Sequence, residues 1–337
     1  MVYLYLAMFF IASFSKTYSG KRTSQIVKRD SDTFLVYSLR MFFCLVIGFF
    51  LLVFAGNLST AKITGTANLL CLFSGAVNSI FLLVWFYSVR VCSMMTISIS
   101  LLLGAAIPIA VDYIFLKSST FSIFKIIGIV LIFVAMLLLS GYEKSRSGKM
   151  GIKQILFLFG NFVLEGSIEL GSLLLNVYNE KNAAAPCSTS VYSFYTYLYG
   201  TSILLIAFFV IKLLEQKKVR DNQKAEMTPE VRAQIPEAYR APDRIGALVK
   251  RLSPVGIHLI IMSTFTFIHL FFQTRALEPG LLDRDVVLST MKAGNLLVSF
   301  ALGLIFKEKP TAKSILGVIV AMIALFCINL LPKVFGF

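Results

Sequence analysis

The sequence predicts an all-α integral membrane protein in which ten transmembrane helices form two inverted five-helix repeats. Hydrophobic residues make up 57% of the 337 residues, and the mean hydropathy is +0.81, which is too apolar for an ordinary soluble domain. The apolar residues gather in ten runs of about 20 residues, the length that a helix needs to cross the hydrocarbon of a bilayer. Two segments, one in each half of the chain, also resemble each other weakly.

The ten expected spans divide the chain into two halves. In order, they cover residues 2–19, 33–56, 67–89, 91–116, 121–142, 155–178, 187–214, 255–274, 281–306 and 312–331. Residues 1–142 form the first half, residues 143–214 and 254–337 form the second, and residues 215–253 form a hydrophilic connector. The similar segments, 115–128 and 306–317, each precede the last helix of a half. Because five is odd, the second half enters the membrane in the opposite direction, as in transporters built from inverted repeats.

The distribution of basic residues predicts the orientation. The formal net charge is +15, but the basic residues lie in connectors between apolar runs, so we expect no nucleic-acid partner. They concentrate in alternate connectors, for example at Lys21, Arg22, Lys144, Arg146, Lys217, Lys218, Lys307 and Lys309. By the positive-inside rule these connectors are cytoplasmic and both termini lie outside.

The connector 215–253 holds nine Lys or Arg and six Asp or Glu. Thr228, Pro229 and Glu230 are typical of a helix start with proline in the first turn. We interpret the segment as a solvated cytoplasmic linker with one short surface helix, and docking of a partner or of an anionic membrane surface is the alternative.

The five cysteines, Cys44, Cys71, Cys92, Cys187 and Cys327, lie mostly within apolar runs. They have no CxxC spacing and no His cluster beside them. We therefore interpret them as small buried hydrophobic residues and expect no metal and no cofactor.

A polar stripe along the sixth span is the main candidate site. At 100° per residue its members fall within an arc of about 80°; they are Asn161, Glu165, Glu169, Ser172, Asn176 and Asn179. Each carboxylate would cost roughly 2.5 kcal/mol or more facing lipid, so the stripe must face a protein interior or a watery cavity. We predict that Glu165 and Glu169 bind substrate or couple transport to protons, and that one of them holds a proton near neutral pH. In the alternative interpretation they only form ion pairs that stabilise the bundle.

Two further helices carry candidate residues. His258 and His269 share one face of the eighth span, where they could pass protons or simply be interior histidines held by polar neighbours. Lys292, Asn295 and Ser299 share a face of the ninth span. There Lys292 could bind an anionic group or neutralise the carboxylates of the sixth span.

The chain resembles a known superfamily. Residues 305–324, IFKEKPTAKSILGVIVAMIA, are similar to the signature before the last helix of the drug/metabolite transporter superfamily, in its ten-helix, EamA-like branch. Arg40, which we expect to open the second helix, and the passage from Trp85 to Pro108 resemble that family more loosely. In the first half, Lys117 and Ser118 replace the Glu that the family carries at the junction, so that position cannot couple transport here.

The resemblance implies a secondary active transporter that moves a small polar metabolite across the plasma (inner) membrane by alternating access. An amino-acid-like, zwitterionic or cationic substrate and proton-coupled export are expected, because the sixth span corresponds to a helix of the small multidrug transporters that carries an intramembrane Glu. Lys292 resembles a lysine of the triose-phosphate and nucleotide-sugar branch, so exchange of a nucleotide sugar or sugar phosphate is the alternative. The expected partners are a small-molecule substrate and the lipid bilayer, with the protein as monomer or homodimer. An integral-membrane enzyme acting on lipid-linked substrates is the alternative from another class.

Overall fold

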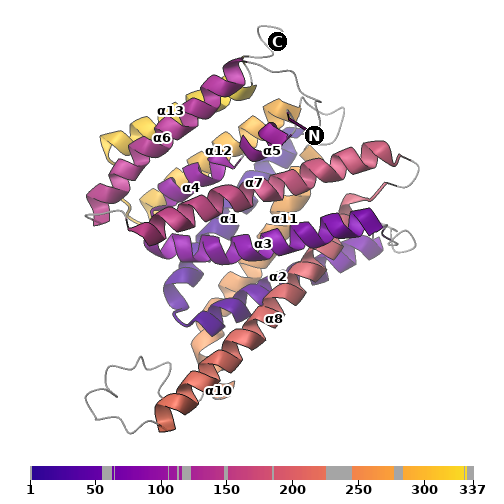
Figure 1. The fold of residues 1–337 in the computed structure, drawn as a ribbon, viewed down its shortest axis with the longest axis vertical. Coiled ribbons are helices and arrows are strands. Elements are labelled where there is room, and N and C mark those ends of the chain that lie inside the picture. Colours follow the sequence, from indigo (N-terminus) through magenta and orange to yellow (C-terminus); the bar gives the residue numbers. More distant parts are fainter. Residues whose placement is uncertain are drawn as a thin grey trace.

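The computed structural model describes residues 2–54, 63, 65–104, 106–111, 114–115, 123–147, 151–183, 186–224, 245–276, 284–329 and 331. Within these residues the chain is helical and has no β-strand, which confirms the predicted all-α class (Figure 1). The helices are α1 Val2–Ile26, α2 Asp30–Phe54, α3 Gly65–Val91, α4 Met94–Leu103, α5 Ala106–Val111, α6 Ile123–Ser147, α7 Ile152–Lys181, α8 Thr189–Lys224, α10 Ile245–Leu252, α11 Gly256–Ala276, α12 Arg284–Ile305 and α13 Ala312–Asn329.

Several helices have the length and composition of membrane spans. In the part of the chain that the structure describes, five helices are long and apolar enough to cross a membrane: α2, α3, α7, α8, and α11 together with the end of α10. Large apolar side chains also point outward, among them Phe54 on α2, Leu137 on α6 and Leu213 on α8. An exposed apolar exterior of this kind suits a lipid environment. The protein is therefore membrane-embedded.

The fourth expected span, 91–116, is interrupted. Helix α4 ends at Leu103, Gly104 caps it, and α5 begins at Ala106. The Gly104 carbonyl accepts a bond from the N–H of Ile107, because Pro108, which would bond to it in a continued α-helix, has no N–H. The chain thus has a discontinuous helix, where the sequence predicted one uninterrupted span.

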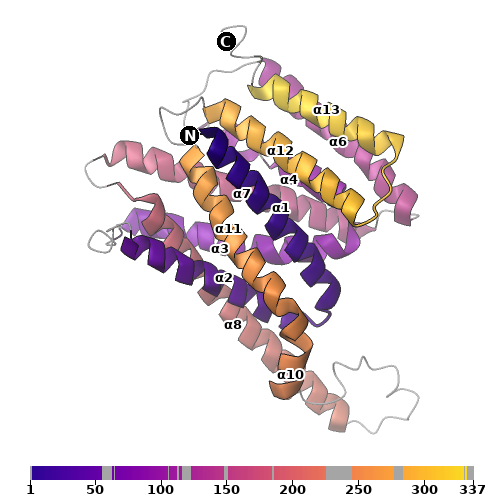
Figure 2. The ribbon, with the colours of Figure 1, turned by 180° about the vertical axis from the view of Figure 1, so that it is seen from behind.

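Helices distant in sequence pack along one another. Helix α1 packs on α11, α2 on α8, α3 on α7 and α8, and α6 on α13, while α12 contacts α1, α4 and α13. Figure 1 and Figure 2 show α6 and α13 together at one end of the molecule and α2 and α8 at the other, with the remaining long helices between them.

Two apolar clusters flank the central helices. One joins α2, α3, α8 and α11 around Tyr37, Phe86 and Met262. The other joins α4, α6, α12 and α13 around Ile99 and Ala321. The polar residues of the central helices therefore lie between two packed apolar regions, each of which holds helices from both halves of the chain.

The remaining expectations about the chain have mixed outcomes. All five cysteines are buried, as predicted, and none of them forms a disulfide bond. Helix α8 continues through Lys224, ten residues beyond the expected end of its span, and α10 forms the end of the hydrophilic connector. The helix start expected at Thr228 lies outside the described residues. Arg40 does not open its helix, because α2 begins at Asp30.

Candidate functional site

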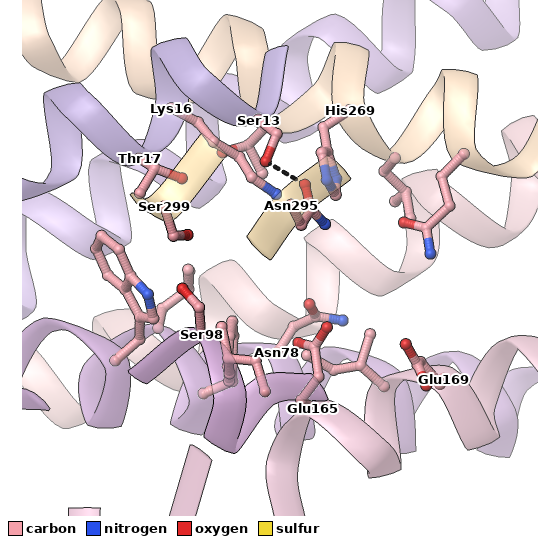
Figure 3. A pocket seen from close by; sticks show the side chains of 18 of the residues that line it. Ser13, Lys16, Thr17, Asn78, Ser98, Glu165, Glu169, His269, Asn295 and Ser299 are labelled. Atoms are coloured by element: carbon pink, nitrogen blue, oxygen red, sulfur yellow. Dashed lines mark hydrogen bonds between the residues drawn. The ribbon is translucent and has the colours of Figure 1, made fainter. Parts of the chain in front are cut away.

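A cavity of about 170 Å³ with polar and apolar lining residues lies among the central helices. Residues from α1, α2, α3, α4, α7, α8, α11 and α12 line it, so both halves of the chain contribute. Its polar lining comprises Ser13, Lys16, Thr17, Arg40, Asn78, Ser98, Glu165, Glu169, Tyr197, Thr266, His269, Gln273, Lys292, Asn295 and Ser299. Figure 3 shows Ser13, Lys16 and Thr17 of α1 on one side of the cavity and Glu165 and Glu169 of α7 on the other.

The two predicted carboxylates share one cation. Lys292 Nζ lies 3.2 Å from Glu165 Oε1, and Lys292 also forms an ion pair with Glu169. The three side chains are 12–22% exposed, so they are largely desolvated and the pairing offsets part of that cost. Pairing with Lys292 was one of the two interpretations of these carboxylates, and it leaves both of them on the wall of the cavity.

Glu165 is positioned by close contact between two backbones. Gly166 on α7 faces Gly104 at the break between α4 and α5. A Cβ atom placed on Gly166 would lie 2.5 Å from the Gly104 carbonyl oxygen, and a Cβ atom on Gly104 would lie 2.8 Å from the Gly166 nitrogen. Only glycine at both positions lets the helices approach this closely. The interruption of the fourth span therefore sets where α7 presents its first carboxylate.

Two more cations, which were not among the predicted site residues, line the cavity. Arg40, in the middle of α2, is 5% exposed and donates from Nε (3.2 Å) and Nη2 (2.5 Å) to Thr266 Oγ1 on α11. Thr266 in turn donates to the Met262 carbonyl oxygen at 2.6 Å, so its hydroxyl is oriented as an acceptor for Arg40. Lys16 lies on α1 opposite Glu165 (Figure 3).

A signal for Lys16 was present in the sequence. Ser13, Lys16, Thr17 and Gly20 follow the i, i+3, i+4, i+7 spacing of one helix face. Lys16 lies near the end of the first apolar run, however, where a basic residue is also typical of the flank of a membrane span. Arg40 has fewer polar neighbours on its helix, because the residues around it are mostly apolar.

Asn295 and His269, both predicted, also reach the cavity. Asn295 Oδ1 accepts a hydrogen bond of 2.6 Å from Ser13 Oγ, which joins α12 to α1 (Figure 3). The His269 ring stacks on the ring of Phe9, with 4.2 Å between the centroids. Asn295 thus connects the two halves across the cavity, and His269 forms part of its wall on α11.

Other predicted residues lie away from the cavity. Asn161 is fully buried and donates to Ser88 Oγ at 2.6 Å, so it fastens α7 to α3. Ser172 and Asn176 are partly buried on α7 but do not line the cavity. The predicted stripe is therefore divided, and only Glu165 and Glu169 reach the site.

His258 is also absent from the cavity wall. It lies eleven residues before His269 on the same helix, which corresponds to about 16 Å along the axis. The two imidazoles therefore cannot pass a proton directly between them.

A second polar cluster joins three helix ends on the side expected to be cytoplasmic. Both Glu308 carboxylate oxygens accept from the N–H of Met94, the first residue of α4, at 3.1 Å. Lys21 at the end of α1 lies 3.8 Å from Glu308 and donates to the Val89 carbonyl oxygen at 2.8 Å. The carboxylate thus caps α4 at its positive end and connects it to α1 and to the segment after α12. These contacts give Glu308 a structural role.

Comparison with known proteins gives the fold alone. No protein-family model and no curated protein matches the chain. A solved structure described only as "Crystal structure of protein" aligns over 100% of this chain and 99% of its own, with a TM-score of 0.55 and 10% sequence identity. The whole chain is therefore similar in fold to a protein of known structure.

Proposed function

We propose that the chain is a secondary active transporter of the drug/metabolite transporter type, which moves a small polar metabolite across the plasma membrane by alternating access. The observation that carries the proposal is the cavity itself. It places five charged side chains, Lys16, Arg40, Glu165, Glu169 and Lys292, inside a membrane-embedded helical bundle. Charged groups in this setting are costly and mark substrate or ion pathways.

The packing of the helices supports an inverted repeat around that cavity. The first proposed half ends with α6, and the second begins with α7. In such a repeat α1 corresponds to α7, α2 to α8, α3 to α11, α4 to α12 and α6 to α13. When each helix is exchanged for its counterpart, the contacting pair α1 and α11 becomes the pair α7 and α3, which also packs together. The pair α3 and α8 becomes α11 and α2, and α4 and α6 becomes α12 and α13. Such exchange symmetry is expected of two repeats that close over a shared site.

The size and charge of the cavity restrict the substrate. A volume of about 170 Å³ is close to the 150 Å³ of an engineered protein cavity that holds benzene. It therefore favours a metabolite of amino-acid size over a nucleotide sugar. With both carboxylates ionised, the three cations leave an excess of one positive charge, which favours an anionic or zwitterionic substrate over a cationic one.

Proton coupling remains part of the proposal. Glu165 and Glu169 are adjacent on one helix face, and both contact Lys292. A change in the proton occupancy of the pair would alter the charge of the cavity, and so the affinity for a charged substrate, between the two sides of the membrane. The proposed orientation keeps both termini outside and the α8 to α10 connector in the cytoplasm.

Uptake by the purified full chain in proteoliposomes tests the proposal. Labelled amino acids, small organic acids, sugar phosphates and polyamines would be supplied with and without an imposed pH gradient. The expected result is saturable uptake of one small polar class that exceeds uptake into protein-free vesicles. Absence of uptake together with turnover of a labelled lipid-linked substrate would instead identify an enzyme.

A further inference from the structure

The cations of the cavity fall into two groups. Lys292 forms ion pairs with both carboxylates, Glu165 and Glu169. Among the described residues, neither Lys16 nor Arg40 has a carboxylate within ion-pair distance, although both line the same cavity. Two positive side chains are therefore held in a membrane-embedded site without a negative partner of their own.

These two cations line one small cavity. Lys16 reaches it from α1 and Arg40 from α2. Repulsion between like charges is stronger in a low-dielectric interior than in water. A fold that keeps two cations in this position gains stability when an anion binds between them, because the anion supplies the missing charge.

We propose that Lys16 and Arg40 bind the negatively charged end of the transported metabolite, a carboxylate or a phosphate. The inference rests on the proposed transport function, and it names the substrate class as a small organic anion. The negative end lies between α1 and α2, and the rest of the molecule extends toward Asn78 and Asn295.

The donors of the two side chains suit a compact oxyanion. Thr266 Oγ1 accepts hydrogen bonds from Nε and Nη2 of Arg40 and so holds the guanidinium in place. The Nη1 atom of Arg40 makes no bond to Thr266. A guanidinium carries five N–H groups in a rigid fork that matches carboxylate and phosphate oxygens. Lys16 donates no hydrogen bond to any described residue, so its three N–H groups can serve a ligand.

Charge balance and size support an anion with a single charge. The site has three cations and two carboxylates, so one added negative charge makes it neutral, which is the least costly state for a buried cluster. The cavity of about 170 Å³ leaves room for only a few carbon atoms beyond the charged group.

Binding by the purified full chain tests the inference, with sodium lactate, inorganic phosphate and putrescine as probes at constant ionic strength. We expect lactate or phosphate to raise the melting temperature and putrescine to leave it unchanged. Stabilisation by lactate would indicate that the site binds a carboxylate, and stabilisation by phosphate that it binds a phosphate group. Lys16→Gln and Arg40→Gln should each weaken anion binding at least about tenfold, the loss of one charged hydrogen bond. Arg22→Gln removes an exposed cation of α1 outside the cavity and should bind as wild type.

A second measurement needs no variant and so does not depend on variant folding. Acylation of Lys16 by an amine-reactive reagent, followed by mass spectrometry, should slow when the bound anion is present, whereas acylation of the exposed Lys28 should not. The proposal is overturned if neither anion stabilises the protein or protects Lys16, if putrescine stabilises it instead, or if both Gln variants bind as wild type. If the anion binds but no probe is taken up, the transport proposal fails and the anion site stands. If uptake occurs and neither variant changes it, the anion site fails and the transport proposal stands.

Discussion

Lys292 Nζ on α12 lies 3.2 Å from Glu165 Oε1 on α7, and the same ammonium contacts Glu169 one turn further along α7. One cation therefore serves two carboxylates on the wall of a cavity inside a membrane-embedded bundle. The arrangement joins α7 to α12 and places two carboxylates and an ammonium group on the cavity wall.

Replacing Lys292 should destabilise the protein. Lys292→Met leaves both carboxylates without their shared cation, and breaking a buried pair in this way costs roughly 3–5 kcal/mol. The double variant Lys292→Met with Glu169→Gln should recover part of the loss, because it removes one stranded charge. Thermal unfolding in detergent measures both effects, with Lys28→Met at an exposed position as the control. Equal melting temperatures for wild type and Lys292→Met would contradict the role assigned to this pair.

The carboxylates should couple transport to protons. Glu165→Gln and Glu169→Gln keep the shape of the side chain but cannot titrate. We expect a pH gradient to stimulate uptake by the wild type, and at least one of these variants to lose that stimulation while still exchanging substrate without a gradient. Asn161→Ala changes a buried residue of the same helix outside the cavity and should keep the stimulation. If both Gln variants respond to the gradient as wild type does, the pair is structural only.

Glu308 should stabilise the junction between α1, α4 and the segment after α12. Glu308→Ala removes the acceptor for the Met94 N–H and the carboxylate near Lys21, which should lower the free energy of unfolding by about 1–3 kcal/mol. Glu308→Gln retains one acceptor oxygen and should lose less. Lys309→Ala, at an exposed neighbouring residue, should be neutral. Thermal unfolding of the three variants tests this order, and an unstable Lys309→Ala with a stable Glu308→Ala would reverse the assignment.

The contact between Gly104 and Gly166 should tolerate no side chain. In Gly166→Ala the new Cβ atom would meet the backbone oxygen of Gly104 at 2.5 Å, so helices α4 and α7 must separate. Overpacking of this kind costs typically about 1–3 kcal/mol. Uptake should fall as well, because Glu165 is the preceding residue. Gly65→Ala, where an added Cβ atom meets nothing within 4 Å, is the matched control, and equal effects of the two substitutions would contradict the account.

The general fold could be predicted from the sequence because apolar length is a local property. Each expected run contains helical residues among those that the structure describes, although the run 91–116 is divided between α4 and α5. The break in the fourth span was less visible, since Gly104 and Pro108 are both common in membrane helices and their effect depends on the close approach of α7. Helix ends were also displaced, as in α8, because a helix can continue past the membrane on polar residues.

The candidate site could be predicted only in part. Glu165, Glu169 and Lys292 were recognisable because a charge in the middle of an apolar run requires an explanation. Periodicity gives the face of a helix but not the depth at which a neighbour covers it, so Asn161 was assigned to the same stripe although α3 buries it. Lys16 was missed for the converse reason: its position near a span end matched a flanking charge, and only the packing of α1 on α11 turns it inward.

Accessibility of the cavity from each side of the membrane tests the central claim most directly. A single cysteine would replace Asn78 on the cavity wall in a chain whose five native cysteines are changed to serine, with a cysteine at Lys28 as a marker for one side. In sealed vesicles of known orientation, an impermeant maleimide should reach Cys at position 78 from either side and the Lys28 marker from one side only. The transported anion should slow the reaction at position 78 on both sides. Labelling of position 78 from one side alone, unchanged by every substrate tested, would contradict alternating access through this cavity.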